Sequence, residues 1–347
     1  MARLLVTGAA GYLGSWIVKT LLDEGHEVHG SVRDLNDPGK TRHLLALARQ
    51  HPGRLHLFEA DLLRPGSFDG AAAQCEIILH SASPYRLQGW VDAQKELIEP
   101  ALHGTEEVLQ AAARNPGVRR VVLTSSIVAC SASHAETRQR HGGVLDEEAW
   151  NDSSQLAIDP YALSKTLAER RAWALAGPPS HWDLVTLNPG AIFGPSLSQR
   201  VDAESVSMMR QFATGQFRSG VPDLQLGIVD VRDVAQAHVR AALQPQAQGR
   251  HVLVAEPRTL LELGRALAAL APDLSQGLPR RTLPRWLIWL LGPLVGLSRH
   301  FVRDNVGLRT QYVNAKSQRT LGLRYRPVEE TLADHLRQLQ RDGLLSP

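Results

Sequence analysis

A tyrosine and a lysine stand four positions apart in DPYALSKTLAERRAW, residues 159–173. The stretch predicts a helix with Asp159 as its N-cap and Pro160 at its first position, so Tyr161 and Lys165 share one face. A free phenol has a pKa of about 10 and is a poor acid at neutral pH, but a neighbouring ammonium stabilises the phenolate and lowers that pKa. The pair is therefore a candidate proton donor. Because the same spacing occurs by chance in many helices, a second feature has to support it.

A pair of serines supplies that support. The residues TSS, 124–126, end the apolar run RRVVLTS. In a doubly wound sheet, ligands bind at the carboxyl ends of the strands, where a serine hydroxyl can hold a carbonyl or alcohol oxygen beside Tyr161. Side chains alternate along a strand, so only one of Ser125 and Ser126 can face that cleft.

Three glycines stand at the start of the first predicted helix. The strand-like run RLLVT leads directly into TGAAGYLGSWIVKTLL, which contains Gly8, Gly11 and Gly14. Glycines at this spacing permit a tight turn and a close approach of the backbone to a ligand. The helix N-terminus offers free N–H groups to a pyrophosphate. We therefore predict a dinucleotide-binding turn.

The end of the second predicted strand indicates which dinucleotide is bound. The residues there are Ser31-Val32-Arg33-Asp34. Arg33 can pair with a 2′-phosphate and stack on adenine, and Lys40 can add a second charge, whereas Asp34 could bind the ribose hydroxyl of NAD. We favour NADPH over NAD. Asp61, after the third predicted strand, is placed to contact the adenine amino group, with a helix N-cap as its alternative role.

Apolar runs of strand length alternate with helical patterns through the first two thirds of the chain, which indicates a parallel sheet with crossover helices. The runs are RLLVT, HEVHGSVR, RLHLFEA, EIILHSA, RRVVLTS and DLVTLNP, and the longest predicted helices span residues 92–115 and 160–175. A strand and helix in 227–243 and a strand at 251–255 are expected to return to the same sheet, and the chain from about residue 259 is expected to be mainly helical. The predicted fold class is α/β, a Rossmann doubly wound parallel sheet with a smaller, mainly helical C-terminal substrate lobe. We assign residues 1–188 and 227–256 to an NADP-binding Rossmann domain, and residues 189–226 and 257–347 to the substrate-binding lobe.

Composition and charge exclude several classes of protein. The formal charge of the 347 residues is +3, with a pI near 9.0, and the basic residues are spread along the chain, which argues against nucleic acid as a partner. Cys75 and Cys130 are far apart and have no CxxC partner, so reduced thiols in a cytoplasmic protein are expected. No cluster of Cys, His and acidic residues predicts a metal site. The N-terminal MARLLVTGAAG lacks the features of a secretory signal.

Two segments have more than one interpretation. WLIWLLGPLVGL, residues 286–297, falls well short of the roughly 20 apolar residues of a spanning helix. We expect a buried helix or a substrate lid there, with peripheral membrane contact as the alternative, because arginines flank it at 280, 281, 285 and 299. The polar segment 131–155 is expected to be a loop or lid near the site, with His134 and His141 in solvent.

In combination, these motifs resemble the extended short-chain dehydrogenase/reductase family, within the NAD-dependent epimerase/dehydratase superfamily. The similar branch holds dihydroflavonol reductases, cinnamoyl-CoA reductases and the microbial aldehyde and methylglyoxal reductases. The resemblance covers nearly the whole chain. It rests on VTGAAGYLGSWIVKTLL, SVRD with Lys40 seven residues after Arg33, HSASPY, ELIEPALHGTEEVLQAA, VRRVVLTSS, YALSKTLAERRAW, LNPGAIFGP and VDVRDVAQAH.

The resemblance implies roles for individual residues. Tyr161 would protonate the substrate carbonyl while hydride leaves the nicotinamide, Lys165 would hold the ribose and tune the tyrosine, and Ser126 would orient and polarise the carbonyl. Residues 80–84 would pass along the cofactor. The implied cofactor-binding residues are Gly8, Gly11, Tyr12, Leu13, Gly14, Arg33, Lys40, Asp61, Leu62, Ala82, Tyr161, Lys165, Pro189 and Gly190. A homodimer through the long helices around Glu96 and Leu167 is a further expectation of the family.

Departures from the family pattern narrow the range of candidate substrates. DPYALSK lacks the longer aromatic motif of the plant cinnamoyl-CoA reductases, which argues against a CoA thioester, and residues 127–130 lack the asparagine that binds the flavonoid in dihydroflavonol reductases. Pro100 stands near the place of an asparagine in the proton relay of many relatives.

The leading hypothesis is an NADPH-dependent carbonyl reductase acting on an aldehyde or ketone. The alternatives are a nucleotide-sugar epimerase or dehydratase, a 3β-hydroxysteroid dehydrogenase-type enzyme, and a non-catalytic NADPH-binding protein.

Overall fold

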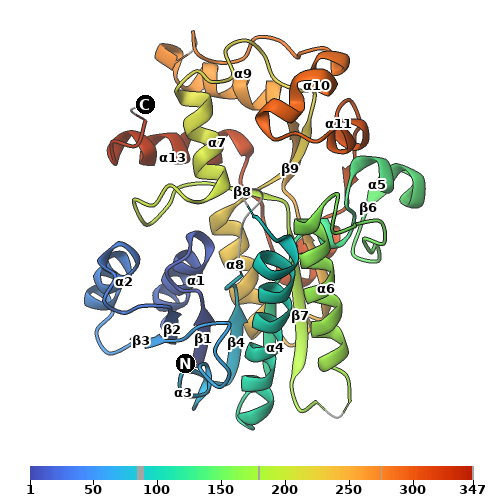
Figure 1. Cartoon of the computed structure of the whole chain (residues 1–347). Coiled ribbons are helices and arrows are strands. Elements are labelled where there is room, and N and C mark those ends of the chain that lie inside the picture. Colours follow the sequence, from blue (N-terminus) through green and yellow to red (C-terminus); the bar gives the residue numbers. More distant parts are fainter. Residues whose placement is uncertain (84–89, 179, 275, 346–347) are drawn as a thin grey trace.

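A single parallel sheet organises the first two thirds of the chain. The computed structural model describes residues 1–83, 90–178, 180–274 and 276–345 (Figure 1). The sheet contains β1 (Arg3–Thr7), β2 (Glu27–Val32), β3 (Leu55–Glu59), β4 (Ile77–His80), β5 (Arg120–Thr124), β7 (Asp183–Pro189) and β10 (Gly249–Leu253). The strand order is β10-β7-β5-β4-β1-β2-β3, so the chain reverses direction across the sheet between β1 and β4. Each of the six predicted runs forms one of these strands, and the Rossmann-like α/β fold is confirmed.

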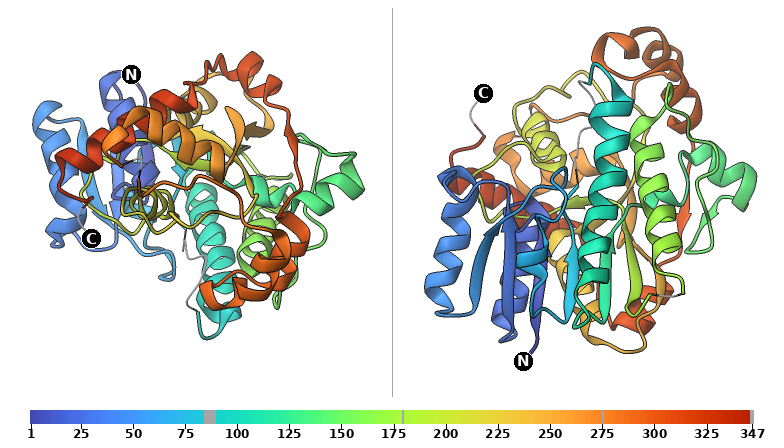
Figure 2. Two further views of the ribbon diagram at one scale, coloured as in Figure 1. Left: turned by 90° about the horizontal axis from the view of Figure 1, so that it is seen from above. Right: turned by 60° about the horizontal axis from the view of Figure 1, so that its bottom comes forward.

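Helices cover both faces of this sheet, which explains why its central strands β1, β4 and β5 are buried along nearly their whole length. One face carries α1 (Tyr12–Asp23), α2 (Pro38–Gln50) and α8 (Val231–Leu243), and its core includes Leu4, Ile17 and Val234. The other carries α3 (Asp69–Ala72), α4 (Glu99–Arg114) and α6 (Pro160–Leu175), with Leu5 and Val108 in the core. The long helices α4 and α6 lie side by side (Figures 1 and 2).

The predicted helix over residues 92–115 is not uniform. It begins with a π-helical turn, Gln94–Ile98, and continues as α4. Pro100 stands in the first turn of α4 and has no N–H to donate to the carbonyl four residues earlier. The wider turn removes the need for that hydrogen bond, so the helix continues through the proline.

A second, smaller sheet lies outside the first. It consists of β8 (Ala191–Phe193), β9 (Gln225–Asp230) and β11 (Glu256–Thr259), and it packs with α7 (Glu204–Ala213), α9 (Leu260–Leu270) and α13 (Val328–Arg341). The expectation that the strand at 227–230 joins the main sheet is therefore wrong, whereas α8 and β10 do return to it. Gly190 explains the difference, because a Cβ there would lie 2.2 Å from the carbonyl oxygen of Gly227. The two glycines allow β8 and β9 to approach closely directly after β7.

The polar segment after β5 contains more structure than its composition predicts. It forms a 3-10 turn (Ile127–Ala129), α5 (His134–His141) and β6 (Val144–Leu145), and β6 pairs with β12 (Gln311–Tyr312). The hydroxyl of Ser133 caps α5 by accepting a hydrogen bond from the Glu136 N–H at 3.1 Å. The expectation of a solvated His134 is wrong, because its ring is buried and its nitrogens hydrogen-bond to the Thr310 hydroxyl and the Gln225 carbonyl.

The chain beyond residue 259 is mainly helical, as predicted. After α9 it forms a 3-10 turn (Pro272–Leu274), α10 (Arg285–Leu291), a 3-10 turn (Gly292–Val295), α11 (Arg299–Asn305), α12 (Ala315–Leu321) and α13. The expectation of a buried helix at 286–297 is wrong, because Ile288 is the only side chain of α10 that is buried. Among the described helices, none has the length and apolar character to cross a bilayer.

Candidate active site

The tyrosine and the lysine lie in the first turns of α6, beside the carboxyl ends of β4 and β5. The ammonium nitrogen of Lys165 lies 6.0 Å from the centre of the Tyr161 ring, so the predicted pairing on one helix face is present. Pro160 occupies the first position of the helix, as predicted. Asp159 is the N-cap residue, as predicted, but its side chain does not cap the helix, because its carboxylate instead accepts hydrogen bonds from the Ser154 hydroxyl at 2.7 Å and the Gln155 N–H at 2.8 Å. These bonds fold the preceding chain back onto the helix start.

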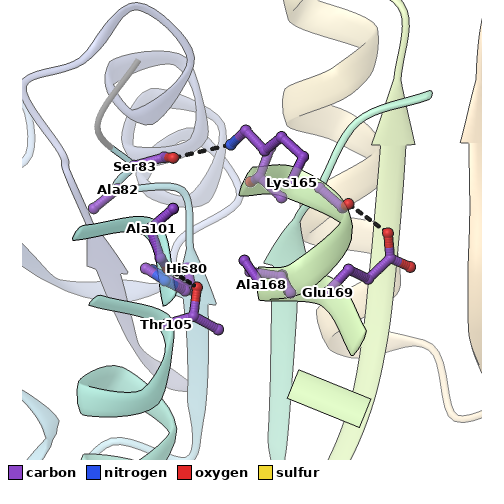
Figure 3. A pocket seen from close by; sticks show the side chains of 11 residues that line it. His80, Ala82, Ser83, Ala101, Thr105, Lys165, Ala168 and Glu169 are labelled. Carbon is purple, nitrogen blue, oxygen red and sulfur yellow. Dashed lines mark hydrogen bonds between the residues drawn. The ribbon is translucent and has the colours of Figure 1, made fainter. Parts of the chain in front are cut away.

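Lys165 is a buried cation. It lines a small cavity with His80, Ala82 and Ser83, and its Nζ donates a hydrogen bond to the Ser83 hydroxyl at 2.9 Å (Figure 3). Burial disfavours the charged form and lowers the pKa of Lys165 to about 8. Burial, together with the nearby lysine, also lowers the pKa of His80 to about 3, so that ring is neutral at physiological pH. The role of Ser83 as the lysine's partner was not singled out from the sequence, although it lies within HSASPY.

The two serines after β5 have separate environments. Ser125 is buried and donates its hydroxyl to the Glu169 carboxylate. Ser126 is extended and half-buried, and its hydroxyl accepts a hydrogen bond from the Val128 N–H at 3.3 Å at the start of the 3-10 turn. The alternation expected from the strand is therefore observed. Ser125 therefore faces the interior of the protein, and Ser126 does not.

A buried ion pair that sequence reasoning missed lies beneath this turn. Glu169, one turn after Lys165 on α6, is fully buried and pairs with Arg250 of β10 at 2.7 Å. Its carboxylate also accepts hydrogen bonds from the Thr186 hydroxyl at 3.0 Å and the Asn188 amide at 2.8 Å. The same amide donates to the Ser126 carbonyl at 3.2 Å. The only sequence feature that could have pointed to Glu169 is that positions 161, 165 and 169 lie on one helix face.

The glycine turn has the geometry of a phosphate cradle. Gly8 has φ +66°, and a Cβ there would lie 2.9 Å from the Cα of Ala82, while a Cβ on Gly14 would lie 2.2 Å from the Gly8 carbonyl oxygen. Helix α1 begins directly after Gly11. The backbone N–H groups of Tyr12 and Leu13 lie in its first turn and therefore have no carbonyl of the same helix as a hydrogen-bond acceptor. The phenol of Tyr12 donates to the Gly194 carbonyl at 2.6 Å and ties the turn to the second lobe.

Two candidate cations for a 2′-phosphate follow β2. Arg33 is exposed and has no hydrogen-bond or ion-pair partner within the described part of the chain. Lys40 lies in the first turn of α2 and pairs with Asp37, the N-cap of that helix, at 2.8 Å. Asp34 accepts a hydrogen bond from the Asn36 N–H at 2.8 Å. These groups surround the end of β2, beside the glycine turn.

The remaining predicted cofactor contacts lie at other strand ends. Asp61 accepts a hydrogen bond from the Leu63 N–H at 2.9 Å, and α3 begins only at Asp69, so the alternative role of Asp61 as a helix N-cap is wrong. Leu62 packs against α4 at Gly104, and the Ala82 N–H donates to the Thr7 hydroxyl at 3.1 Å. Pro189 is the last residue of β7, and Gly190 follows it directly. Pro84 and Tyr85 of HSASPY lie outside the described residues.

No group of three His, Cys, Asp or Glu side chains within the described ranges could hold a metal ion. Cys75 and Cys130 are buried and free. The candidate site consists of the Tyr161–Lys165 pair, a serine turn and a glycine turn, which lie at the carboxyl ends of neighbouring strands.

Comparison with known proteins places this chain in a family. Residues 4–255 match the NAD dependent epimerase/dehydratase family. The chain is 34% identical to "Cinnamoyl-CoA reductase CAD2" of Medicago truncatula, over 96% of this chain and 94% of the relative, and 34% identical to "Tetraketide alpha-pyrone reductase 1" of Arabidopsis thaliana, over 99% and 97%. It belongs to this family, in the extended short-chain dehydrogenase/reductase branch, as the motifs indicated.

A solved structure extends the comparison to the whole fold. The yeast methylglyoxal/isovaleraldehyde reductase Gre2, complexed with NADPH, superposes with a TM-score of 0.79 at 25% identity and covers 99% of both chains. These relatives are all reductases, which confirms the expectation of an oxidoreductase.

Proposed function

We propose that the protein is an NADPH-dependent carbonyl reductase that transfers hydride to an aldehyde or ketone, reversibly, with Tyr161 as the general acid and base. The single observation that carries this proposal is the buried ammonium of Lys165 on the same helix face as the Tyr161 ring. A structural lysine gains nothing from such burial, because removing an ammonium from water costs free energy. Burial strengthens its effect on a neighbouring phenol, which is what a tyrosine acid requires.

The proposed roles follow from the positions of these side chains. When bound, the reduced nicotinamide supplies a hydride to the carbonyl carbon. Ser126 donates a hydrogen bond to the carbonyl oxygen and orients it, since Ser125 is engaged by Glu169. Tyr161 then gives its phenolic proton to that oxygen as negative charge develops there. Lys165 favours the phenolate that remains, and Ser83 holds the lysine in place.

The residues present fit a nicotinamide dinucleotide. Side chains at Gly8 or Gly14 would fill the space where the backbone turns, and free N–H groups at the start of α1 suit a pyrophosphate. Arg33 and Lys40 would bind the 2′-phosphate, which favours NADPH over NAD. Asp61 and Leu62 would contact the adenine, and Ala82, Pro189 and Gly190 would line the remaining path. The NADPH in the yeast relative supports this assignment.

Several coarser expectations complete the proposal. We propose that residues 1–188 and 227–256 form the cofactor-binding domain, with β9 of the second range pairing in the smaller sheet, and that 189–226 and 257–347 form the substrate-binding lobe. The buried reduced thiols Cys75 and Cys130 fit a cytoplasmic protein. The adjacent helices α4 and α6 fit a homodimer interface. Because DPYALSK lacks the aromatic motif of the cinnamoyl-CoA reductases, we propose a free aldehyde or ketone rather than a CoA thioester.

The test is oxidation of NADPH and of NADH with a panel of aliphatic and aromatic aldehydes, β-ketoesters and a steroid ketone, run beside Tyr161→Phe. We expect turnover with NADPH that the variant loses while it still binds NADPH. Bound cofactor without turnover of any carbonyl would contradict the reductase. Isomerisation of a sugar nucleotide or sterol without net cofactor oxidation would instead identify the epimerase or hydroxysteroid alternative.

A further inference from the structure

The segment from Gln276 to Arg303 has an unusual charge distribution. It contains no aspartate or glutamate in 28 residues and carries five arginines and one histidine, at positions 280, 281, 285, 299, 303 and 300. Arg303 pairs with Asp304, just beyond the segment. The other four arginines have no carboxylate within ion-pair distance among the residues that the structure describes. The segment is therefore positively charged with little local compensation.

The same segment exposes large apolar side chains. On α10, Trp286 is 67% exposed, and in the turn that follows, Leu294 and Val295 are 82% and 72% exposed. Further exposed members of this group are Trp289, Leu290 and Leu291. Scattered apolar residues on a surface need no explanation, but a contiguous apolar group with a polar rim marks an interaction site. We call these six residues, together with Arg280, Arg281, Arg285 and Arg299, the α10 face.

The α10 face is not needed to hold its own segment together. Ile288, Val302 and Val306 form a small buried cluster, and Leu283 and Leu297 pack against it. This cluster joins α10 to α11 on the inner side. The six exposed side chains thus add nothing to that core, although their exposure to water is unfavourable.

The charges select one class of partner. We propose that the α10 face binds the surface of a bilayer that contains anionic lipids, with its tryptophans and leucines in the interfacial region and its arginines at the headgroups. Tryptophan favours this interface, and arginine beside an apolar helix face is typical of helices that lie on it. The guanidinium of Arg299 lies 4.4 Å from the Trp289 ring centre, so charge and aromatic surface are presented together. A second copy of the chain would bring two cationic rims into contact, which is unfavourable.

The position of the α10 face suits this role. Helices α10 and α11 stand at the end of the molecule toward which the main strands run, beyond the ends of α4 and α6 (Figures 1 and 2). Helix α11 contacts α5, and the Asn305 side chain accepts a hydrogen bond from the His134 N–H at 3.3 Å. The α10 face is therefore attached to the segment that follows Ser126.

The experiment is co-sedimentation of the full-length protein with vesicles of two parts phosphatidylcholine and one part phosphatidylglycerol, and with vesicles of phosphatidylcholine alone. We expect binding to the anionic vesicles that weakens with added salt. Trp286→Ser/Leu294→Ser should lower the affinity about tenfold or more, because it removes two interfacial side chains. Arg280→Gln should lower it about fivefold, and only on the anionic vesicles.

Matched controls separate this effect from general loss of charge or apolar surface. Leu45→Ser on α2 and Arg319→Gln on α12 change exposed residues of the same types on other elements, and neither should alter binding. All these positions are exposed, so thermal unfolding should stay near the wild type. The proposal needs no turnover, so its outcome is independent of the carbonyl reductase assignment.

Three results would overturn it. The first is a wild type that sediments with neither type of vesicle. The second is a double variant and a Leu45→Ser control that bind equally well. The third is a dimer in light scattering that the double variant dissociates while vesicle binding is absent, which would assign the α10 face to a second copy of the chain.

Discussion

At the scale of single residues, the reaction depends on the protonation state of Lys165. Its pKa is lowered to about 8 by burial, so the ammonium is present below that pH and is lost above it. The groups that face it are Tyr161 on its own helix, Ser83 after β4 and the neutral His80 of β4. Only the lysine carries positive charge near the phenol in this set. Its loss removes the group that stabilises the phenolate.

We therefore predict that kcat for carbonyl reduction falls as the pH rises through about 8, where the Lys165 ammonium deprotonates. A kcat–pH profile measured at saturating NADPH tests this. Lys165→Arg retains its charge far above this pH. If its activity is measurable, the decline near pH 8 should be absent from its profile. An unchanged decline in the variant would assign the titration to another group.

A second residue-scale prediction concerns the glycine cradle. Gly8→Ala adds a Cβ that meets the Ala82 backbone and imposes a positive φ on a residue with a side chain. We expect the Kd for NADPH to rise about tenfold or more, since backbone approach to the pyrophosphate depends on this glycine. Fluorescence titration with NADPH provides the measurement.

Gly53→Ala is its matched control. Gly53 also has a positive φ, +74°, but nothing lies within 4 Å of an added Cβ. This substitution should cost about 1 kcal/mol of stability from the backbone alone. NADPH affinity should stay at the wild-type value. An equal loss of affinity in both variants would attribute the Gly8 effect to general destabilisation.

At the scale of elements, Glu169 joins α6 to three strands of the sheet. It pairs with Arg250 of β10 and accepts hydrogen bonds from Ser125 after β5 and Asn188 of β7. Arg250 also donates to the carbonyls of Glu147 and Ala149 and stacks on Trp150 at 3.9 Å. The network fixes the serine turn relative to the helix that carries Tyr161. It is a positioning network, since none of its members lies among the reacting groups.

We predict that Glu169→Gln destabilises the fold by about 3 kcal/mol, because it leaves the Arg250 charge buried without its partner. It should also lower kcat with little change in the Kd for NADPH. Adding Arg250→Met should recover part of the stability, since both buried charges are then gone. Urea denaturation and steady-state kinetics measure the two effects.

The pair of Arg120 and Asp183, at 2.6 Å, provides a control on the same sheet. It joins β5 and β7 at the ends opposite to the serine turn. Asp183→Asn should reduce stability without changing kcat. If both acidic residues affected kcat equally, the effect of Glu169 would be general loosening of the sheet.

Elements with one strong local signal could be predicted from the sequence. The six strands, the glycine turn and the Tyr161–Lys165 helix face each follow from the order of residues in one segment. The buried His134 and the Glu169–Arg250 pair could not, because their partners lie more than 80 residues away along the chain. The place of β9 depended on Gly190 and Gly227 meeting across two segments. Long-range contacts of this kind leave no periodic pattern.

At the scale of the whole molecule, buried neutral histidines link folding to pH. Burial lowers the pKa of His80 and His335 to about 3, and the pKa of His238 and His251 to about 4. In the unfolded chain the pKa of these rings is about 6.5. Above that value both states are neutral, so the histidines make no contribution to pH dependence. Below it the unfolded chain binds protons that the folded chain does not, so the free energy of unfolding falls until the folded-state pKa is reached.

We expect each of these rings to reduce the free energy of unfolding by about 2 kcal/mol between roughly pH 7.5 and pH 5. His335→Asn tests the size of one contribution, because Nδ1 of His335 accepts a hydrogen bond from the Gly194 N–H at 3.2 Å and the asparagine oxygen can replace that acceptor. Urea denaturation at both pH values should show a difference that is smaller by about this amount in the variant, whatever its stability at neutral pH. His103→Asn, at an exposed position of α4, should leave the difference unchanged. Equal pH dependence in the wild type and His335→Asn would show that acid destabilises this protein through its carboxylates. The Glu27 carboxylate, for example, is paired with Arg3, and its pKa in the folded state is lowered. Protonating it therefore also removes stability as the pH falls.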